Sequence, residues 1–132
     1  MSASDNKERM RTIFAATAQG LFEPLVEAMA GETTWTIMGS TPFSRTFAGK
    51  EAILTQLLGP LRARIAGTIR LTAGRFIAED DLVVVEAKGD STTVEGVPYN
   101  NSYCFVFRLA EGKIREITEY IDTQLVMKAF GR

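Results

Sequence analysis

The sequence predicts one α+β domain, because helical and strand-like patterns occupy different parts of the chain. Apolar residues recur at helical spacing in three stretches up to Leu61, whereas from Ile69 onward they recur at every second residue. Strands and helices do not alternate, as they do around a parallel sheet. A length of 132 residues with 45% hydrophobic content suits a single domain. We therefore expect one domain over residues 1–132, with residues 1–4 as a flexible tail.

Three helices and one short strand are expected in the first half of the chain. The helices are predicted over residues 5–20, 21–29 and 50–61, and the strand over residues 32–38. Asp5, followed three residues later by Glu8, is typical of an N-cap and predicts the start of the first helix. Gly31 is the expected end of the second helix. Gly59 and Pro60 should interrupt or kink the third helix, because proline has no N–H to donate.

Four strands and a last helix are expected in the second half. The strands are predicted at Ile69–Ala78, Leu82–Ser91, Tyr99–Ala110 and Lys113–Ile121, with short polar or glycine-containing turns between them. An antiparallel meander is the simplest arrangement of these strands. Asp122 is the predicted N-cap of a helix over Thr123–Phe130, whose apolar residues can close over the sheet.

The charge balance and the residue content argue against several classes of function. The 15 basic and 16 acidic residues give a net charge of −1, so we expect no nucleic acid and no membrane surface as a partner. No apolar run has the length of a secretory signal core or a membrane span, and we expect a cytoplasmic protein. With Cys104 as the single cysteine and no histidine, we expect no metal site and no cofactor. Asp, Glu, Lys, Tyr and Cys remain as candidate acids and bases.

A carboxylate in the last predicted strand is the main candidate for chemistry. Alternation places Glu119 between Ile117 and Ile121 on one apolar strand face. An ionised carboxylate on a buried face costs several kcal/mol unless it is paired, or else its pKa rises. Glu119 is therefore either a functional group or one half of a buried structural pair, with Tyr103 or Lys88 as its partner.

Three stretches carry a resemblance to a known family. They are TTWTIMGSTPFSRTFAGKEAI, VEGVPYNNSYCFVFRLAEGKI and EITEYIDT. Over nearly its whole length the chain resembles the SnoaL-like, ketosteroid-isomerase-related branch of the nuclear-transport-factor-two-like superfamily. The resemblance implies a cone-shaped, curved antiparallel sheet wrapped around N-terminal helices, the cystatin-like arrangement, with a conical pocket. It also implies a homodimer built on the outer sheet face.

The alternation of the strands, combined with this resemblance, selects the residues expected in the pocket. The inner face of the fourth predicted strand, Tyr99–Ala110, should carry its aromatic residues, and Cys104 and Val106 should face outward. The strand Leu82–Ser91 could offer either face, and Glu86 and Lys88 are favoured inward because they could neutralise Glu119. The expected pocket residues are Trp35, Ile37, Tyr99, Asn101, Tyr103, Phe105, Ile117 and Ile121.

The superfamily includes isomerases, polyketide cyclases, dehydratases, epoxide hydrolases and non-catalytic binding domains, so the fold does not choose the reaction. Against the isomerase pattern, this chain has Ile37 at the position of the base, Phe14 near that of the tyrosine and Phe105 at that of the neutral aspartate. The limonene-epoxide-hydrolase pattern has an arginine and an aspartate two residues apart on one strand and a second aspartate on the last strand. This chain has Lys88, Asp90 and Glu119 at these positions, with lysine in place of arginine.

These observations lead to one expected function and its alternatives. We expect a pocket for a small, mostly apolar organic molecule, with Glu119 as acid or base in an isomerase, cyclase or hydrolase. Tyr103 and Asn101 would donate hydrogen bonds, and Lys88 or Asp90 would be charge partners in catalysis. The alternatives are a non-catalytic ligand-binding or dimerisation module, a limonene-epoxide-hydrolase-like hydrolase, and an interaction protein that uses its outer sheet face.

Overall fold

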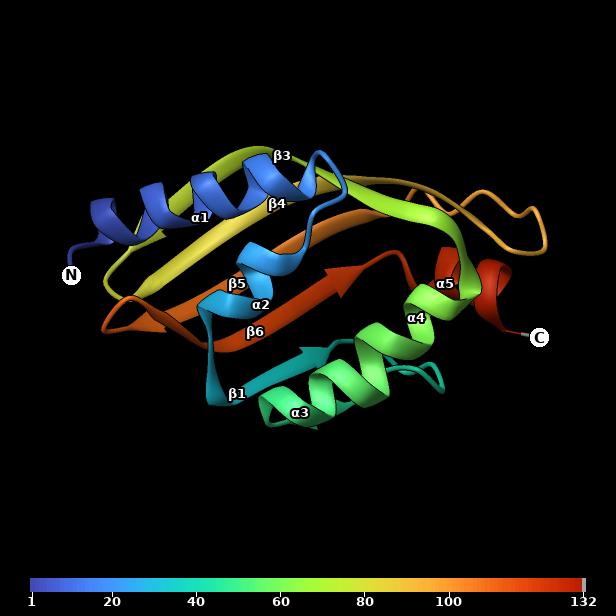
Figure 1. Ribbon diagram of the computed structural model, residues 1–132, viewed down its shortest axis with the longest axis horizontal. Helices are drawn as coiled ribbons and strands as arrows, with labels where there is room; N and C mark the ends of the chain where they lie inside the picture. The colour runs from blue at the N-terminus through green and yellow to red at the C-terminus, as the bar shows by residue number, and fades with distance from the viewer. Residues whose placement is uncertain (132) are drawn as a thin grey trace.

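The computed structural model describes residues 1–131 and has one six-stranded sheet with helices packed on it (Figure 1). No helix in that range is long and apolar enough to cross a membrane. The helical elements are α1 (Ala3–Thr17), α2 (Glu23–Ala28), α3 (Lys50–Ala52), η1 (Ile53–Leu58), α4 (Gly59–Arg64) and α5 (Thr123–Phe130). The strands are β1 (Met29–Ile37), β2 (Thr46–Ala48), β3 (Ile65–Glu79), β4 (Leu82–Thr93), β5 (Ser102–Ala110) and β6 (Lys113–Ile121).

The sheet has the order β2-β1-β6-β5-β4-β3. Strands β3 to β6 form the expected antiparallel meander, so the α+β prediction is confirmed. The pair of β1 and β6 is parallel. β1 also pairs antiparallel with β2, a short strand that was not expected from the sequence. The helix-rich first half of the chain thus also supplies one edge of the sheet.

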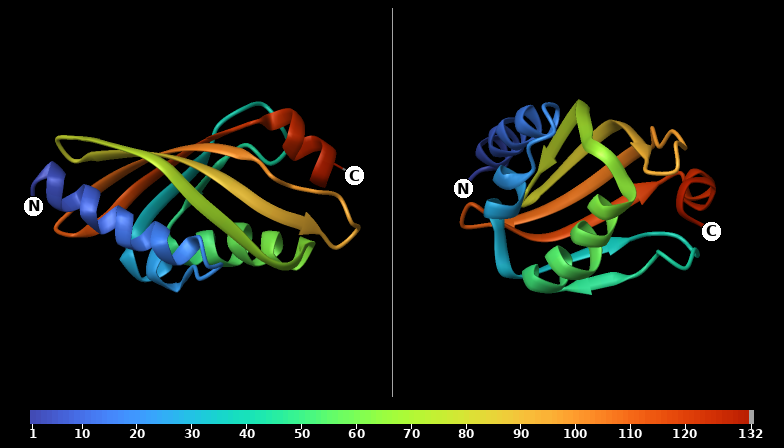
Figure 2. Two further views of the ribbon diagram at one scale, coloured as in Figure 1. Left: turned by 90° about the horizontal axis from the view of Figure 1, so that it is seen from above. Right: turned by 45° about the vertical axis from the view of Figure 1, so that its right-hand side comes forward.

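The sheet is strongly curved, and its long strand β3 contributes to the bend (Figure 2). The pairing of β3 with β4 shifts register between Ala66 and Arg70 and again between Ala73 and Phe76. Such bulges bend a strand and increase its twist. β3 also begins at Ile65, earlier than the predicted Ile69, because it follows directly from α4. The helices α1, α2 and the segment from α3 to α4 lie on the inner, concave side of this sheet.

The N-terminal helix begins earlier than expected. Ser2, not Asp5, is the N-cap, and Asp5 is the third helical residue of a capping box with Ser2. Each of the two residues accepts a hydrogen bond from the backbone N–H of the other, which satisfies two donors of the first turn. Residues 3 and 4, expected in a flexible tail, therefore lie in the first turn of α1. The second helix ends at Ala28 rather than near Gly31, because Met29 already pairs with Ile114 of β6.

The third helix continues past Gly59 and Pro60, and the predicted interruption takes the form of a π-helical turn directly before them. The helical path continues without a gap from α3 into α4 (Figure 1). Between them η1 has the wider π-helical hydrogen bonding. The N–H of Gly59 donates to the carbonyl of Leu54, five residues earlier. This register accommodates Pro60, which lacks an N–H and in an α-helix clashes with the carbonyl four residues before it. Glycine suits position 59, since a Cβ there would come within 3.0 Å of the Leu54 oxygen.

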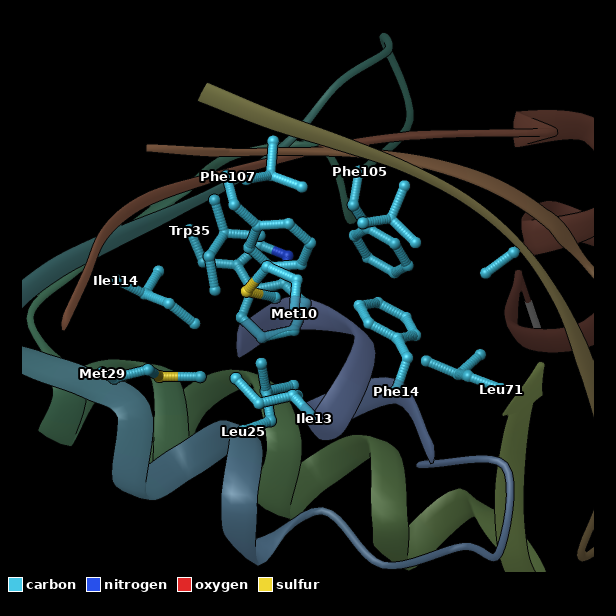
Figure 3. Close-up of a cluster of buried hydrophobic side chains, with 14 of the residues drawn as sticks. Met10, Ile13, Phe14, Leu25, Met29, Trp35, Leu71, Phe105, Phe107 and Ile114 are labelled. Carbon is cyan, nitrogen blue, oxygen red and sulfur yellow. The ribbon is translucent and has the colours of Figure 1, made fainter. Parts of the chain in front are cut away.

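The hydrophobic core lies between α1 and one end of the concave face (Figure 3). Met10, Ile13 and Phe14 form the buried stripe of α1. The ring of Phe14 contacts the rings of Phe105 and Phe107 of β5, with centroid distances of 5.9 Å in both cases. Burial of one such side chain contributes about 1.5–3 kcal/mol. This packing holds α1 across β3, β4 and β5.

The C-terminal helix is attached to the sheet by a buried amide. Asp122 caps α5 as predicted, accepting from the N–H groups of Gln124 and Leu125. Asn101, expected in the pocket, is fully buried beside this cap instead. Its Nδ2 donates to the Asp122 carbonyl at 3.1 Å and its Oδ1 accepts from the Asp122 N–H at 3.0 Å. Asn101 therefore joins the start of β5 to the junction of β6 and α5.

We predict that Asn101→Ala lowers the free energy of unfolding by about 3 kcal/mol. The change leaves the partly buried N–H and carbonyl of Asp122 without their partner, and a group left unsatisfied costs roughly 1–3 kcal/mol. Urea denaturation measures the loss. Asn100→Ala is the matched control, because Asn100 is exposed and accepts one hydrogen bond, from the N–H of Ser91. Equal losses in the two variants would contradict the role given to Asn101.

Candidate functional site

A cavity of about 270 Å³ lies between the concave face of the sheet and the helical segment Ile53–Arg64. Apolar side chains from α1, α2, β1, β3, β5 and β6 make up most of its wall. The lining residues with polar side-chain atoms are Trp35, Arg45, Gln56, Arg64, Tyr99, Tyr103 and Glu119. An apolar cavity with a few converging polar groups is the usual form of a small-molecule site. This cavity is therefore the candidate functional site.

Glu119 is the one carboxyl in the described wall of the cavity, and it is 7% exposed. Its Oε1 accepts a hydrogen bond of 2.9 Å from Nε1 of Trp35. Burial raises the pKa of Glu119 to about 7, and the bond from Trp35 opposes this rise. Because desolvation outweighs the single donor, the carboxyl is half protonated near neutral pH.

The bond between Trp35 and Glu119 depends on the parallel pairing of β1 with β6. In this register Ile37 lies opposite Glu119 and Trp35 opposite Ile117. The indole therefore comes from a position diagonal to the carboxyl on the same face of the sheet. The Trp35 ring also packs edge-on against Phe105, with 6.4 Å between centroids. The donor to Glu119 is thus held by the core.

Two tyrosine side chains lie near Glu119 in the cavity wall. Burial raises the pKa of Tyr99 to about 12, and burial also raises the pKa of Tyr103 well above its ordinary value. Both are therefore neutral hydroxyls that can donate hydrogen bonds. Nδ2 of Asn101 donates to the Tyr99 oxygen at 3.2 Å, which leaves the Tyr99 proton free for another acceptor.

The position of Tyr103 depends on a glycine in the neighbouring strand. A Cβ at Gly89 of β4 would lie 3.1 Å from Cε1 of Tyr103 and 3.5 Å from its hydroxyl oxygen. The ring therefore lies against bare backbone at Gly89. On its other side it stacks on Phe105, with a centroid distance of 5.2 Å and an interplanar angle of 7°. These two contacts fix the direction of the hydroxyl.

The structure brings most of the expected site residues together. The residues that line the cavity are Trp35, Ile37, Tyr99, Tyr103, Phe105, Glu119 and Ile121. Asn101 and Ile117 do not line it. Ile117 is 1% exposed and packs in the core. Its neighbours on the adjacent strands, Trp35 of β1 and Phe107 of β5, line the cavity instead.

The expectation that Lys88 and Asp90 belong to the site is wrong. Both are exposed on the outer face of β4, and Nζ of Lys88 donates to Ser102 Oγ at 3.2 Å. The inward face of β4 instead carries Val83, Val85 and Ala87, because this apolar set buries more favourably than the charged one.

Glu86 also faces outward, where it forms an ion pair with Arg75. The expected inward placement of Glu86 and Lys88 is therefore wrong, and the partner of Glu119 is Trp35 rather than Lys88 or Tyr103. The two-carboxylate arrangement of the limonene-epoxide-hydrolase pattern is absent from the described cavity wall.

The polar residues at the mouth of the cavity are not among the site residues that the sequence predicts. The mouth consists of the exposed lining residues Pro42, Phe43, Arg45, Gln56 and Pro60 and the half-buried Arg64. One signal was available, since Phe43, Arg45 and Phe47 alternate with polar residues in a strand-like pattern. Gln56 and Arg64 gave no such signal, because their placement depends on the π-helical register of η1. Residues 1–131 contain no cluster of three His, Cys, Asp or Glu side chains placed to hold a metal ion.

Comparison with solved structures finds the same fold in several proteins. An NTF2-like protein of unknown function from Burkholderia pseudomallei has a TM-score of 0.82 at 21% identity, covering 100% of both chains. A protein from Bacillus subtilis that has been assigned as an isomerase has a TM-score of 0.75 at 23% identity, covering 99% of this chain and 96% of its own. A protein from Jannaschia sp. CCS1 that has been assigned as a SnoaL-like polyketide cyclase has a TM-score of 0.77 at 17% identity, covering 96% and 92%.

Comparison with curated proteins finds no significant match. The family model described as the SnoaL-like domain matches residues 10–117, which cover the second half of α1 and most of the sheet and end two residues before Glu119. The match extends over far more than half of the 132 residues. The chain therefore belongs to the SnoaL-like domain family and has the NTF2-like fold.

Proposed function

We propose that this protein carries out cofactor-independent acid–base catalysis on a small, mostly apolar organic molecule held in the cavity. The observation that carries the proposal is the buried Glu119 carboxyl at an apolar wall, with its pKa raised to about 7 by burial. A group with this pKa is present in both protonation states near neutral pH. It can accept a proton and return it, which general acid–base catalysis requires.

In the proposed step, the Glu119 carboxylate takes a proton from a carbon next to a carbonyl group. The electron pair of the broken C–H bond delocalises into an enolate, and return of the proton to a different carbon gives an isomer. The neutral hydroxyl of Tyr103, diagonal to Glu119 across the pairing of β5 with β6, can donate a hydrogen bond to the enolate oxygen. The names of the neighbours assigned as an isomerase and a polyketide cyclase agree with this proposal.

A non-catalytic ligand-binding module is the second candidate. It is favoured by the apolar residues Phe14, Ile37 and Phe105, which stand where the isomerase resemblance places its polar groups. Such a module would use the same cavity, with Glu119 as a hydrogen-bond donor to a bound ligand. The two candidates differ in whether proton exchange in the cavity depends on Glu119.

We predict that the protein catalyses hydrogen–deuterium exchange next to the carbonyl of 2-tetralone, an apolar enolisable ketone. Glu119→Gln should lower this rate by about 10²–10⁴-fold, because the amide cannot accept the proton. Proton NMR in D₂O follows the exchange. Glu116→Gln is the matched control on the same strand, since Glu116 faces outward and pairs with Arg108. A rate unchanged by Glu119→Gln would favour the binding module.

We also predict that the contribution of Glu119 to stability decreases as the pH rises from about 4.5 to about 7. The unfolded chain loses this proton near pH 4.5 and the folded protein near 7. The stabilisation is therefore complete below pH 4.5 and is lost as the pH rises through 7, a change on the order of 3 kcal/mol. Urea denaturation of the wild type and Glu119→Gln across this range measures it. A difference between the two proteins that is independent of pH would rule out the raised pKa.

The outer face of the sheet supports a homodimer as part of the proposal. Val84, Val106 and Thr118 lie opposite one another across β4, β5 and β6 on this face, next to Cys104 and the 46% exposed Tyr120. A contiguous apolar patch rimmed by polar residues is typical of a protein interface.

We predict that Val106→Lys converts a dimer into a monomer, because the lysine charge would be buried against its counterpart across a two-fold interface. Size-exclusion chromatography with light scattering measures the mass. Val94→Lys is the matched control, since Val94 is 59% exposed in the loop between β4 and β5. A wild-type protein that is monomeric, or a Val106→Lys variant that remains dimeric, would contradict this interface.

A further inference from the structure

The charged groups around the cavity are unbalanced in favour of cations. The lining has two guanidinium groups, Arg45 and Arg64, and one carboxyl, Glu119. Glu119 lies deep in the wall and is half neutral near pH 7, whereas both arginines lie at the mouth. The entrance to an otherwise apolar cavity therefore has a positive charge.

The two arginines differ in how far their charge is compensated. Arg64 has the carboxylate of Glu95 at 3.7 Å, and its guanidinium lies over the ring of Phe130. Arg45 has no carboxylate within ion-pair distance among residues 1–131. The free positive charge at the mouth is thus that of Arg45.

Neutral groups hold the guanidinium of Arg45 in place. Its plane lies over the ring of Phe47, with 4.3 Å from Cζ to the centroid, and one Nη donates to Gln56 Oε1 at 2.8 Å. Four of its five N–H donors have no protein acceptor in the described part of the chain. With its oxygen bound to Arg45, the Gln56 amide keeps two N–H donors of its own. Arg45 and Gln56 together thus present several N–H donors at the mouth that have no protein acceptor in the described part of the chain.

Arg45 and Glu119 lie in one row across the sheet. The N–H of Ile37 donates to the carbonyl of Arg45 at 2.9 Å, and Ile37 lies opposite Glu119 in the pairing of β1 with β6. Two strand spacings separate the Cα atoms of Arg45 and Glu119 by about 10 Å. The side chains of all three residues reach the cavity wall, with the apolar Ile37 between the two charged ones.

We propose that the cavity takes an apolar organic acid, whose carboxylate binds Arg45 and Gln56 at the mouth while its apolar body extends toward Glu119. This inference rests on the proposed function in that it names the class of substrate presented to Glu119. A planar guanidinium binds a carboxylate through two parallel hydrogen bonds, which fixes the direction of the ligand. The mouth of the cavity thus binds the carboxylate of the ligand, and the apolar wall binds the rest of the ligand.

The test compares two probes of equal shape, 2-naphthoate and 2-naphthamide, by isothermal titration calorimetry at pH 6. At this pH the probe acid is ionised and Glu119 is mostly neutral. The wild type should bind the naphthoate roughly tenfold more tightly than the naphthamide. Arg45→Gln should remove this preference by weakening the naphthoate alone. Arg70→Gln, which removes an exposed arginine from the outer side of β3, is the control with the same charge change and should keep the preference.

The proposal is overturned if neither probe binds, if both bind equally to the wild type, or if Arg45→Gln weakens both probes alike. The last result would mean that Arg45 acts as part of the wall rather than as an anion site. The outcome is independent of catalysis, because Glu119→Gln should retain the naphthoate preference even where it abolishes exchange of 2-tetralone. If only proton exchange is lost, the proposed anion site is still supported. If only the preference for naphthoate over naphthamide is lost, the proposed acid–base catalysis is still supported.

Discussion

The packing of α1 against one end of the curved sheet is the interaction on which the rest of the structure depends. Phe14 contacts the aromatic residues of β5 and fills the concave face at that end. The helix stops at Thr17, whose hydroxyl donates to the carbonyl of Leu71 on β3. Beyond this point α1 no longer covers the concave face, and the cavity begins there with Phe14 as part of its wall. One side chain thus completes the core and limits the space left for a ligand.

The buried carboxyl in the cavity wall destabilises the folded protein, and a purely structural protein would have an apolar residue there. A leucine at position 119 would suit the apolar surroundings of Ile117 and Ile121, yet the chain has a carboxyl there with one donor, Trp35. Buried polar groups normally have their hydrogen-bonding capacity satisfied, because desolvation without partners is expensive. The protein reduces that cost by holding the carboxyl partly protonated, which is also the state that proton transfer uses.

The sequence could predict the parts of the fold that local rules decide. The meander of β3 to β6, the cap at Asp122 and the inward direction of Glu119 follow from alternation and capping, and the structure has all of them. The inward face of β4 differs from the prediction because burial of Val83 and Val85 outweighs compensation of the charge of Glu119. The donor from Trp35 could not be predicted, since it needs the parallel pairing of β1 with β6 across more than eighty residues of sequence.

The π-helical turn in η1 is a point at which a one-residue change in length could alter the cavity of this protein. A π-helical turn contains one residue more than the α-helical turn it replaces. Deletion of one residue from Ile53–Leu58 would remove the bulge and restore α-helical pairing, while the helical turns on either side kept their facing. Gln56 and Leu57 lie in this turn and line the cavity, so the deletion would change which side chains of the segment face the cavity while the strands kept their register. A single-codon deletion or insertion at this point can therefore change the shape and polarity of the cavity without disturbing the sheet that forms its other side.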